Sequence, residues 1–179
     1  SLGALGSELL ITGSVTGNIF DRELMVWDSA DPSTPASLGA NINTYSGSGD
    51  GSSFPIGYVT RCGESYFTAS AGFDFILENR ELWKWDGFEA SLVKDFYTGG
   101  TNAGRPQSIT VIGDEIYMFA NDGVTGQELW RTKGSETVRL TDLRSGVDGS
   151  VSGSPGIMSW NNQIFTAMWG PTGIELYAY

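Results

Sequence analysis

The chain has 179 residues, a formal net charge of −11 and a pI near 4.2. A chain this acidic repels phosphate backbones and anionic lipid heads, so nucleic acid is a poor partner. It also contains no apolar run of about 18 residues, so we expect no membrane insertion. Its 25 glycines and its low charged fraction of 17% are typical of short strands and turns, so we expect all-β structure.

Two residue types limit the chemistry of the chain. It contains no histidine, which removes the commonest general base, the commonest zinc ligand and every Ser-His or Cys-His nucleophile pair. Cys62 is the only cysteine, so it forms no internal disulfide, and we expect it to be a small buried residue. The sequence therefore favours a non-catalytic protein.

A short motif recurs along the chain and organises the whole sequence. It reads ELMVWDS from Glu23, ELWKWDG from Glu81, ELWRTKG from Glu128 and ELYAY from Glu175, at spacings of 58, 47 and 47 residues. A period in this range is typical of repeated β units such as propeller blades. We therefore predict a single domain over residues 1–179, with repeat units at approximately 1–53, 54–105, 106–153 and 154–179.

Each unit is predicted to form an antiparallel blade of four short strands separated by turns. In the third unit the strands are expected near residues 107–112, 115–120, 127–132 and 137–142. The fourth unit ends at the motif strand, so the last blade is expected to be incomplete. An open strand edge invites pairing, so another copy or a further chain is the expected partner there. The predicted fold is a β-propeller of about four blades, or part of a larger propeller or repeat array.

These motifs resemble the ELWxxDGT repeat of large secreted or surface-attached proteins. The match is close at residues 120–130 (ANDGVTGQELW) and at residues 81–87, where Asp86 and Gly87 fit the pattern. It is weaker in the third copy, where Lys133 and Ser135 depart from it. The resemblance implies propeller-like β units and an extracellular or cell-surface location. It implies no common activity.

The repeated glutamates have two interpretations. A carboxylate at a strand start accepts backbone N–H groups from an adjacent tight loop, a requirement that every blade shares. The aromatic positions Trp83, Trp130 and Tyr177, with Met25, would then fill the space between sheets. The alternative is a repeated sugar platform. The position of Trp85 varies among the units, so along this strand Trp85 is the expected ligand contact.

Ligand binding is expected where the units differ, in the loops at one end of the sheets. The loops between second and third strands are expected at 14–21, 70–79, 121–126 and 169–173. Those between successive units are expected at 45–54, 98–105 and 145–154. The candidate residues in these loops are Asp21, Tyr45, Asp50, Asp74, Arg105, Asp122, Asp148 and Trp169.

Calcium is the cation to consider, because Asp lies beside Gly and hydroxyl residues in several loops. Neither the EF-hand spacing nor the calcium-binding nonapeptide is present. The sequence thus predicts an extracellular, lectin-like interaction module that recognises a glycan or a protein through its loops. One alternative is a structural subunit of a larger assembly. The other is a hydrolase or lyase that uses paired acidic residues.

Overall fold

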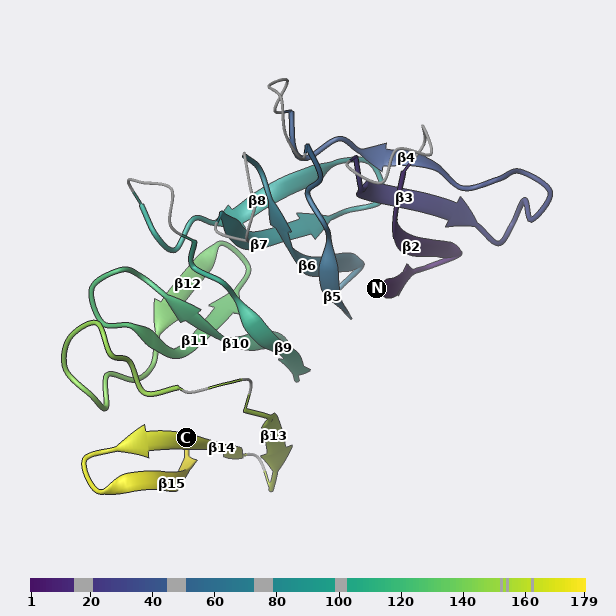
Figure 1. Ribbon diagram of the computed structural model, residues 1–179. Helices are drawn as coiled ribbons and strands as arrows, with labels where there is room; N and C mark the ends of the chain where they lie inside the picture. The colour runs from purple at the N-terminus through teal and green to yellow at the C-terminus, as the bar shows by residue number, and fades with distance from the viewer. Residues whose placement is uncertain are drawn as a thin grey trace. The chain divides into compact units, whose positions relative to one another are not determined.

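The computed structural model consists of β-strands joined by turns and loops (Figure 1). It describes residues 1–14, 21–44, 51–72, 79–98, 103–151, 153, 155–161 and 163–179. Within these residues the strands form four antiparallel sheets, which confirms the all-β prediction. No helix among these residues is long and apolar enough to cross a membrane.

The first two sheets each contain four strands in chain order. The strands of the first sheet are β1 (Leu2–Leu5), β2 (Glu8–Gly13), β3 (Glu23–Asp28) and β4 (Ser37–Ala40). The strands of the second sheet are β5 (Ile56–Arg61), β6 (Glu64–Ser70), β7 (Arg80–Trp85) and β8 (Ala90–Lys94).

The third sheet has the same plan, and the fourth has one strand fewer. The strands of the third sheet are β9 (Gln107–Ile112), β10 (Glu115–Asn121), β11 (Gln127–Lys133) and β12 (Glu136–Arg139). Those of the fourth sheet are β13 (Ile157–Trp160), β14 (Gln163–Gly170) and β15 (Gly173–Ala178). The expected incomplete last blade is therefore confirmed.

Each sheet lies within one of the predicted repeat units, and each motif glutamate lies on the third strand of its sheet. The chain divides into two compact units of two sheets each, Ser1–Asp95 and Phe96–Tyr179. We call them the first and second unit.

Tight turns join the first two strands in each of the first three sheets. Gly113 has a φ of 63° between β9 and β10, a left-handed conformation that glycine adopts without strain. In the second sheet Cys62 occupies the matching turn with a φ of 51° and is exposed. The expectation that Cys62 is buried was therefore wrong, because the residue lies in a surface turn.

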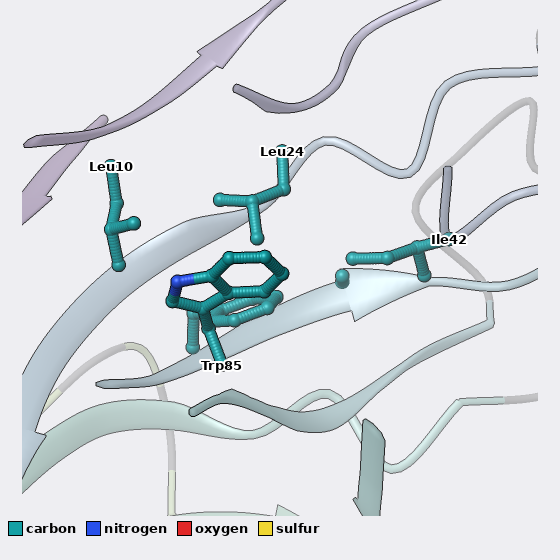
Figure 2. Packing of buried hydrophobic residues seen from close by; sticks show 6 residues of the cluster. Leu10, Leu24, Ile42 and Trp85 are labelled. Carbon is teal, nitrogen blue, oxygen red and sulfur yellow. The ribbon is translucent and has the colours of Figure 1, made fainter. Parts of the chain in front are cut away.

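The core of the first unit lies between its two sheets (Figure 2). Leu10, Leu24 and Ile42 come from the side of the first sheet, and Phe67 and Ala69 come from β6. Alternate side chains of a strand share a face, so these residues form one apolar layer between the sheets.

Trp85 belongs to this layer and is only 4% exposed. Its indole Nε1 donates a hydrogen bond to the carboxylate of Glu8, at 2.9 Å. This geometry assigns Trp85 a structural role in the core, and a ligand contact at Trp85 stays a prediction.

The core of the second unit repeats this arrangement. Tyr117, Phe119 and Leu129 of the third sheet pack against Ile164 and Met168 of the fourth sheet. In both units, therefore, one face of the earlier sheet packs against a face of the following sheet.

We expect Trp85→Ala to destabilise the protein by about 3–5 kcal/mol, because it leaves a large cavity and removes the partner of Glu8. The matched control is Phe88→Ala, since Phe88 is 90% exposed in the turn between β7 and β8. That change should stay within about 0.5 kcal/mol. Urea unfolding measures both, and equal effects of the two substitutions would contradict the assigned core.

Candidate functional site

The carboxylate of Glu23 joins β3 to the loop that leads into the next sheet. Its Oε2 accepts the backbone N–H of Ile42 at 2.8 Å and the hydroxyl of Ser53 at 2.6 Å. Its Oε1 accepts the backbone N–H of Ser53 at 3.0 Å. The carbonyl of Ser53 in turn accepts the N–H of Ser70, at the end of β6, at 2.9 Å. Ser53 is thus bonded to both sheets of the first unit.

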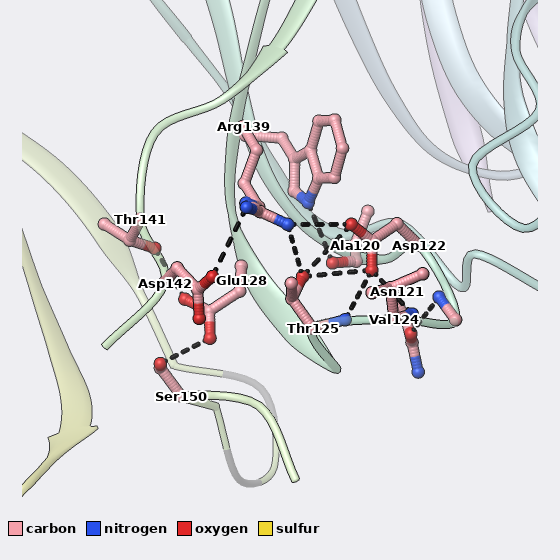
Figure 3. Close-up of polar contacts among 12 residues, drawn as sticks. Ala120, Asn121, Asp122, Val124, Thr125, Glu128, Arg139, Thr141, Asp142 and Ser150 are labelled. Carbon is pink, nitrogen blue, oxygen red and sulfur yellow. Dashed lines mark hydrogen bonds and ion pairs between the residues drawn. The ribbon is translucent and has the colours of Figure 1, made fainter. Parts of the chain in front are cut away.

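Glu128 makes the corresponding link in the second unit (Figure 3). Its carboxylate accepts the hydroxyl of Thr141 at 2.7 Å and the hydroxyl of Ser150 at 2.5 Å. The carbonyl of Ser150 accepts the N–H of Trp169, on β14, at 2.7 Å. We call this contact, Glu23 with Ser53 and Glu128 with Ser150, the glutamate–serine link.

The structure also places the other two motif glutamates on the third strands of their sheets. Glu81 is 5% exposed and lies opposite Ala69 in the register of β6 and β7. Glu175 accepts hydroxyl hydrogen bonds from Thr172 and Tyr177, which lower its pKa. Its sheet has three strands among the described residues.

The environment of Glu23 is that of a structural carboxylate. Burial raises the pKa of Glu23, and the hydrogen bonds from Ser53, Ile42 and Asn43 partly offset the effect. Glu23 is 2% exposed and Glu128 is fully buried, so neither faces solvent, where a sugar would bind.

The large motif residues lie in or beside the cores. Met25 is 6% exposed, and Trp83 packs against the core of the first unit. Trp130 is 8% exposed, donates from Nε1 to the carbonyl of Ala120 at 2.9 Å, and meets the ring of Phe96 edge-on. Tyr177 packs against the core of the second unit.

Three of the candidate loop residues, Tyr45, Asp50 and Asp74, lie outside the described residues. Asp21 is half-buried immediately before β3. The remaining four candidates, Arg105, Asp122, Asp148 and Trp169, all belong to the second unit. The loop geometry around these four candidates is therefore described for the second unit.

Asp122 organises the loop between β10 and β11 (Figure 3). It accepts the backbone N–H groups of Val124 and Thr125, at 2.9 and 2.8 Å, and pairs with Arg139 at 2.9 Å. Burial alone raises the pKa of Asp122, but the two amides, the Thr125 hydroxyl and the Arg139 charge outweigh it and lower the pKa overall. The carboxylate of Asp122 is therefore engaged by groups of the protein itself, namely two backbone amides and the Arg139 guanidinium.

A hollow of about 300 Å³ lies beside this loop. The lining residues are Tyr97 and Arg105 before β9, Asn121 at the end of β10, Gly123 in the loop after it, and Val147 in the loop after β12. A Cβ on Gly123 would lie 2.5 Å from the ring of Tyr97, so only glycine allows that ring to lie on the backbone here. The hollow thus combines an aromatic ring with a guanidinium and an amide.

A second hollow, of about 370 Å³, lies at the end of β14. Trp169 and Arg144 line it, and Arg144 pairs with Asp148 at 3.5 Å. The structure therefore brings Trp169 and Asp148 to one place through Arg144. The sequence pointed to both of these residues, but not to Arg144 or Tyr97.

A third hollow, of about 550 Å³, lies at the turn that joins β9 and β10. Asp114, Glu115 and Arg131 line it, and Lys133 pairs with both carboxylates, at 2.9 and 3.4 Å. Hydrogen bonding from Tyr117 lowers the pKa of Glu115. Sequence reasoning missed this site because its residues lie in regular strands and a two-residue turn.

In the part of the chain that the structure describes, no group of three or more His, Cys, Asp or Glu residues could hold a metal ion. The calcium hypothesis also involved Asp50, which lies outside that part.

The chain is similar to a number of solved structures. The match to an acylaminoacyl peptidase from Pyrococcus horikoshii has a TM-score of 0.56 at 12% identity and covers 100% of this chain. The match to the β-propeller domain of the Trilobed protease from Pyrococcus furiosus has a TM-score of 0.51 at 11% identity and covers 99% of this chain. No protein-family model and no curated protein matches the chain.

This similarity shows the fold alone. The chain spans 25% of the length of the first of these structures and 48% of the second. Its four sheets are therefore propeller blades, and together they correspond to part of a propeller.

We expect Glu23→Gln to destabilise the protein by about 1–3 kcal/mol, because an amide removes one of the two acceptor oxygens that the buried donors of Ser53 and Ile42 require. Glu175→Gln is the matched control in the same motif, and it should change stability little, because Glu175 binds only two hydroxyls. Urea unfolding gives both values. Comparable losses in the two variants would argue against the glutamate–serine link.

Asp122 should make stability depend on pH. Because its folded pKa is lowered, its contribution is present above its unfolded pKa of about 3.9 and is lost as the pH falls through the folded pKa. Wild type should thus exceed Asp122→Asn by about 1–3 kcal/mol near pH 7. The difference in unfolding free energy should shrink below about pH 4. A difference that does not change with pH would contradict this role.

Proposed function

We propose that this chain is a non-catalytic β-propeller module that binds a glycan through the loops at one end of its blades. The observation that carries the proposal is the first hollow, where Tyr97, Arg105 and Asn121 lie together. A concave site with an aromatic wall and a few polar groups is the usual form of a small-ligand site.

The chemistry of the hollow suits a sugar. The face of an aromatic ring packs against the apolar face of a sugar ring and buries it from water. Arg105 adds planar donors, and Asn121 carries both a donor and an acceptor group. A volume of about 300 Å³ is at the lower limit for ligand pockets, which suits one sugar residue of a longer glycan.

The acidic residues support binding rather than hydrolysis. A glycoside hydrolase needs one carboxyl group that is protonated as an acid and a second nearby carboxylate. The first hollow is lined by no carboxylate among the described residues. In the third hollow Asp114 and Glu115 pair with Lys133, and the lowered pKa of Glu115 keeps that group ionised.

We also propose that the chain belongs to the ELWxxDGT repeat proteins and lies outside the cell or on its surface. The position of the motif supports the family, because all four copies lie on the third strand of their sheets. A structural subunit is the second candidate function. The observation in its favour is the exposed apolar face of the fourth sheet, described below.

A glycan array tests the proposed function. For any glycan that wild type binds, the Tyr97→Ala and Arg105→Ala variants should have an affinity at least about tenfold lower. Each substitution removes one wall of the hollow. Val124→Ala is the control, because Val124 is 70% exposed in the neighbouring loop but does not line the hollow.

Melting temperatures should show that all three variants remain folded. An array without binding, or equal loss of binding in the Val124→Ala control, would overturn the glycan proposal.

A further inference from the structure

The fourth sheet presents a broad apolar face to solvent. Cross-strand partners lie on one face of a sheet, so the pairs Trp169 with Ile174 and Ala167 with Leu176 place these residues together. Ile174 is 64% exposed and Leu176 is 73% exposed. On β13 of the same sheet Trp160 is 66% exposed. Contiguous exposed apolar surface of this kind marks an interaction site.

The third sheet shows how such a face is covered. Leu129 occupies the place in the motif that Leu176 occupies in the fourth copy, and Tyr117 corresponds to Phe165. Leu129 and Tyr117 are buried against the fourth sheet. In the first unit Leu24, the motif leucine of β3, is fully buried against the second sheet. We call the surface of a sheet that carries the motif leucine (Leu24, Leu129 or Leu176) the leading face. The opposite surface is the trailing face.

The trailing face of the first sheet is exposed at its outer strands, although Met25 in the middle of it is buried. Leu9 and Ile11 lie on it, because the leading face of β2 is the one that carries Leu10. Leu2 pairs with Ile11 and is 67% exposed. Leu38 pairs with Met25, beside Ile11, and is 42% exposed. Its exposed side chains are apolar, like the side chains that the trailing faces contribute to the two cores.

We propose that two copies of this chain associate head to tail, with the leading face of the fourth sheet in one copy packing on the trailing face of the first sheet in the other. The contact would repeat the sheet-on-sheet packing that each unit already contains in its core. It joins two different surfaces, so it is heterologous and allows a closed ring or an open chain of copies. The proposal does not depend on the glycan site.

The charge of the chain gives the association a salt dependence. Copies with a net charge of −11 repel one another, whereas the two proposed faces carry apolar side chains. Added salt screens the repulsion and leaves the apolar contact intact. Association should therefore strengthen as salt concentration rises.

The experiment uses two variants that each block one face. Leu176→Asp blocks the leading face and Leu2→Asp blocks the trailing face, and both residues are exposed enough that the fold should remain intact. Each change should weaken self-association roughly a hundredfold or more, because an unpaired carboxylate would have to be buried. Phe88→Asp is the control, since Phe88 is 90% exposed in a turn and lies on neither face.

Light scattering after size exclusion, over a wide range of protein concentration, measures the outcome. Wild type and the Phe88→Asp variant should self-associate, and each blocked variant alone should be a monomer. An equal mixture of the two blocked variants should form a one-to-one dimer, because one intact leading face and one intact trailing face remain.

Three outcomes would overturn the proposal. The first is a wild-type chain that is monomeric at every concentration, with its faces covered in another way. The second is a Leu2→Asp variant that still self-associates, since leading faces would then be pairing with each other. The third is a mixture of blocked variants that stays monomeric while wild type associates.

Discussion

A buried carboxylate that binds a loop serine joins one sheet to the next, and the rest of the structure depends on this contact. Burying a charge is costly unless its acceptor sites are filled, and Glu23 meets that condition with donors from Ile42 and Ser53. The carbonyl of Ser53 continues the connection to β6. The contact therefore fixes where the second sheet of a unit begins relative to the first sheet of that unit.

The structural role of the motif glutamate could be predicted from the sequence, because the glutamate recurs in every repeat unit. A glutamate that recurs at the start of the third strand of every unit points to a need that every unit shares. The strands of the third sheet were placed within a few residues, since glycine and Asx turns bound them on both sides. The donors themselves could not be predicted, because Ser53 and Ser150 lie 30 and 22 residues from their glutamates in loops of different length.

The sequence was least informative about residues whose burial depends on packing between sheets. Trp85 was expected at a ligand because its position varies among the copies, yet its ring fills the space next to Leu10 and Phe67. Alternation along a strand tells which residues share a face, but it does not tell which face another sheet covers. The same limit applies to Leu176, which carries the motif leucine and is exposed.

The glutamate–serine link also explains why the candidate binding site lies in loops. In the second unit, Thr141 and Ser150 are both held by Glu128, so the ends of the intervening loop are fixed. Residues between fixed ends change in sequence and length at little cost to the sheets, because loop closure costs rise only slowly with length. That loop supplies Val147 to the first hollow and Arg144 to the second. The rigid repeat thus leaves the lining of both hollows free to differ from blade to blade, which is what a binding surface requires.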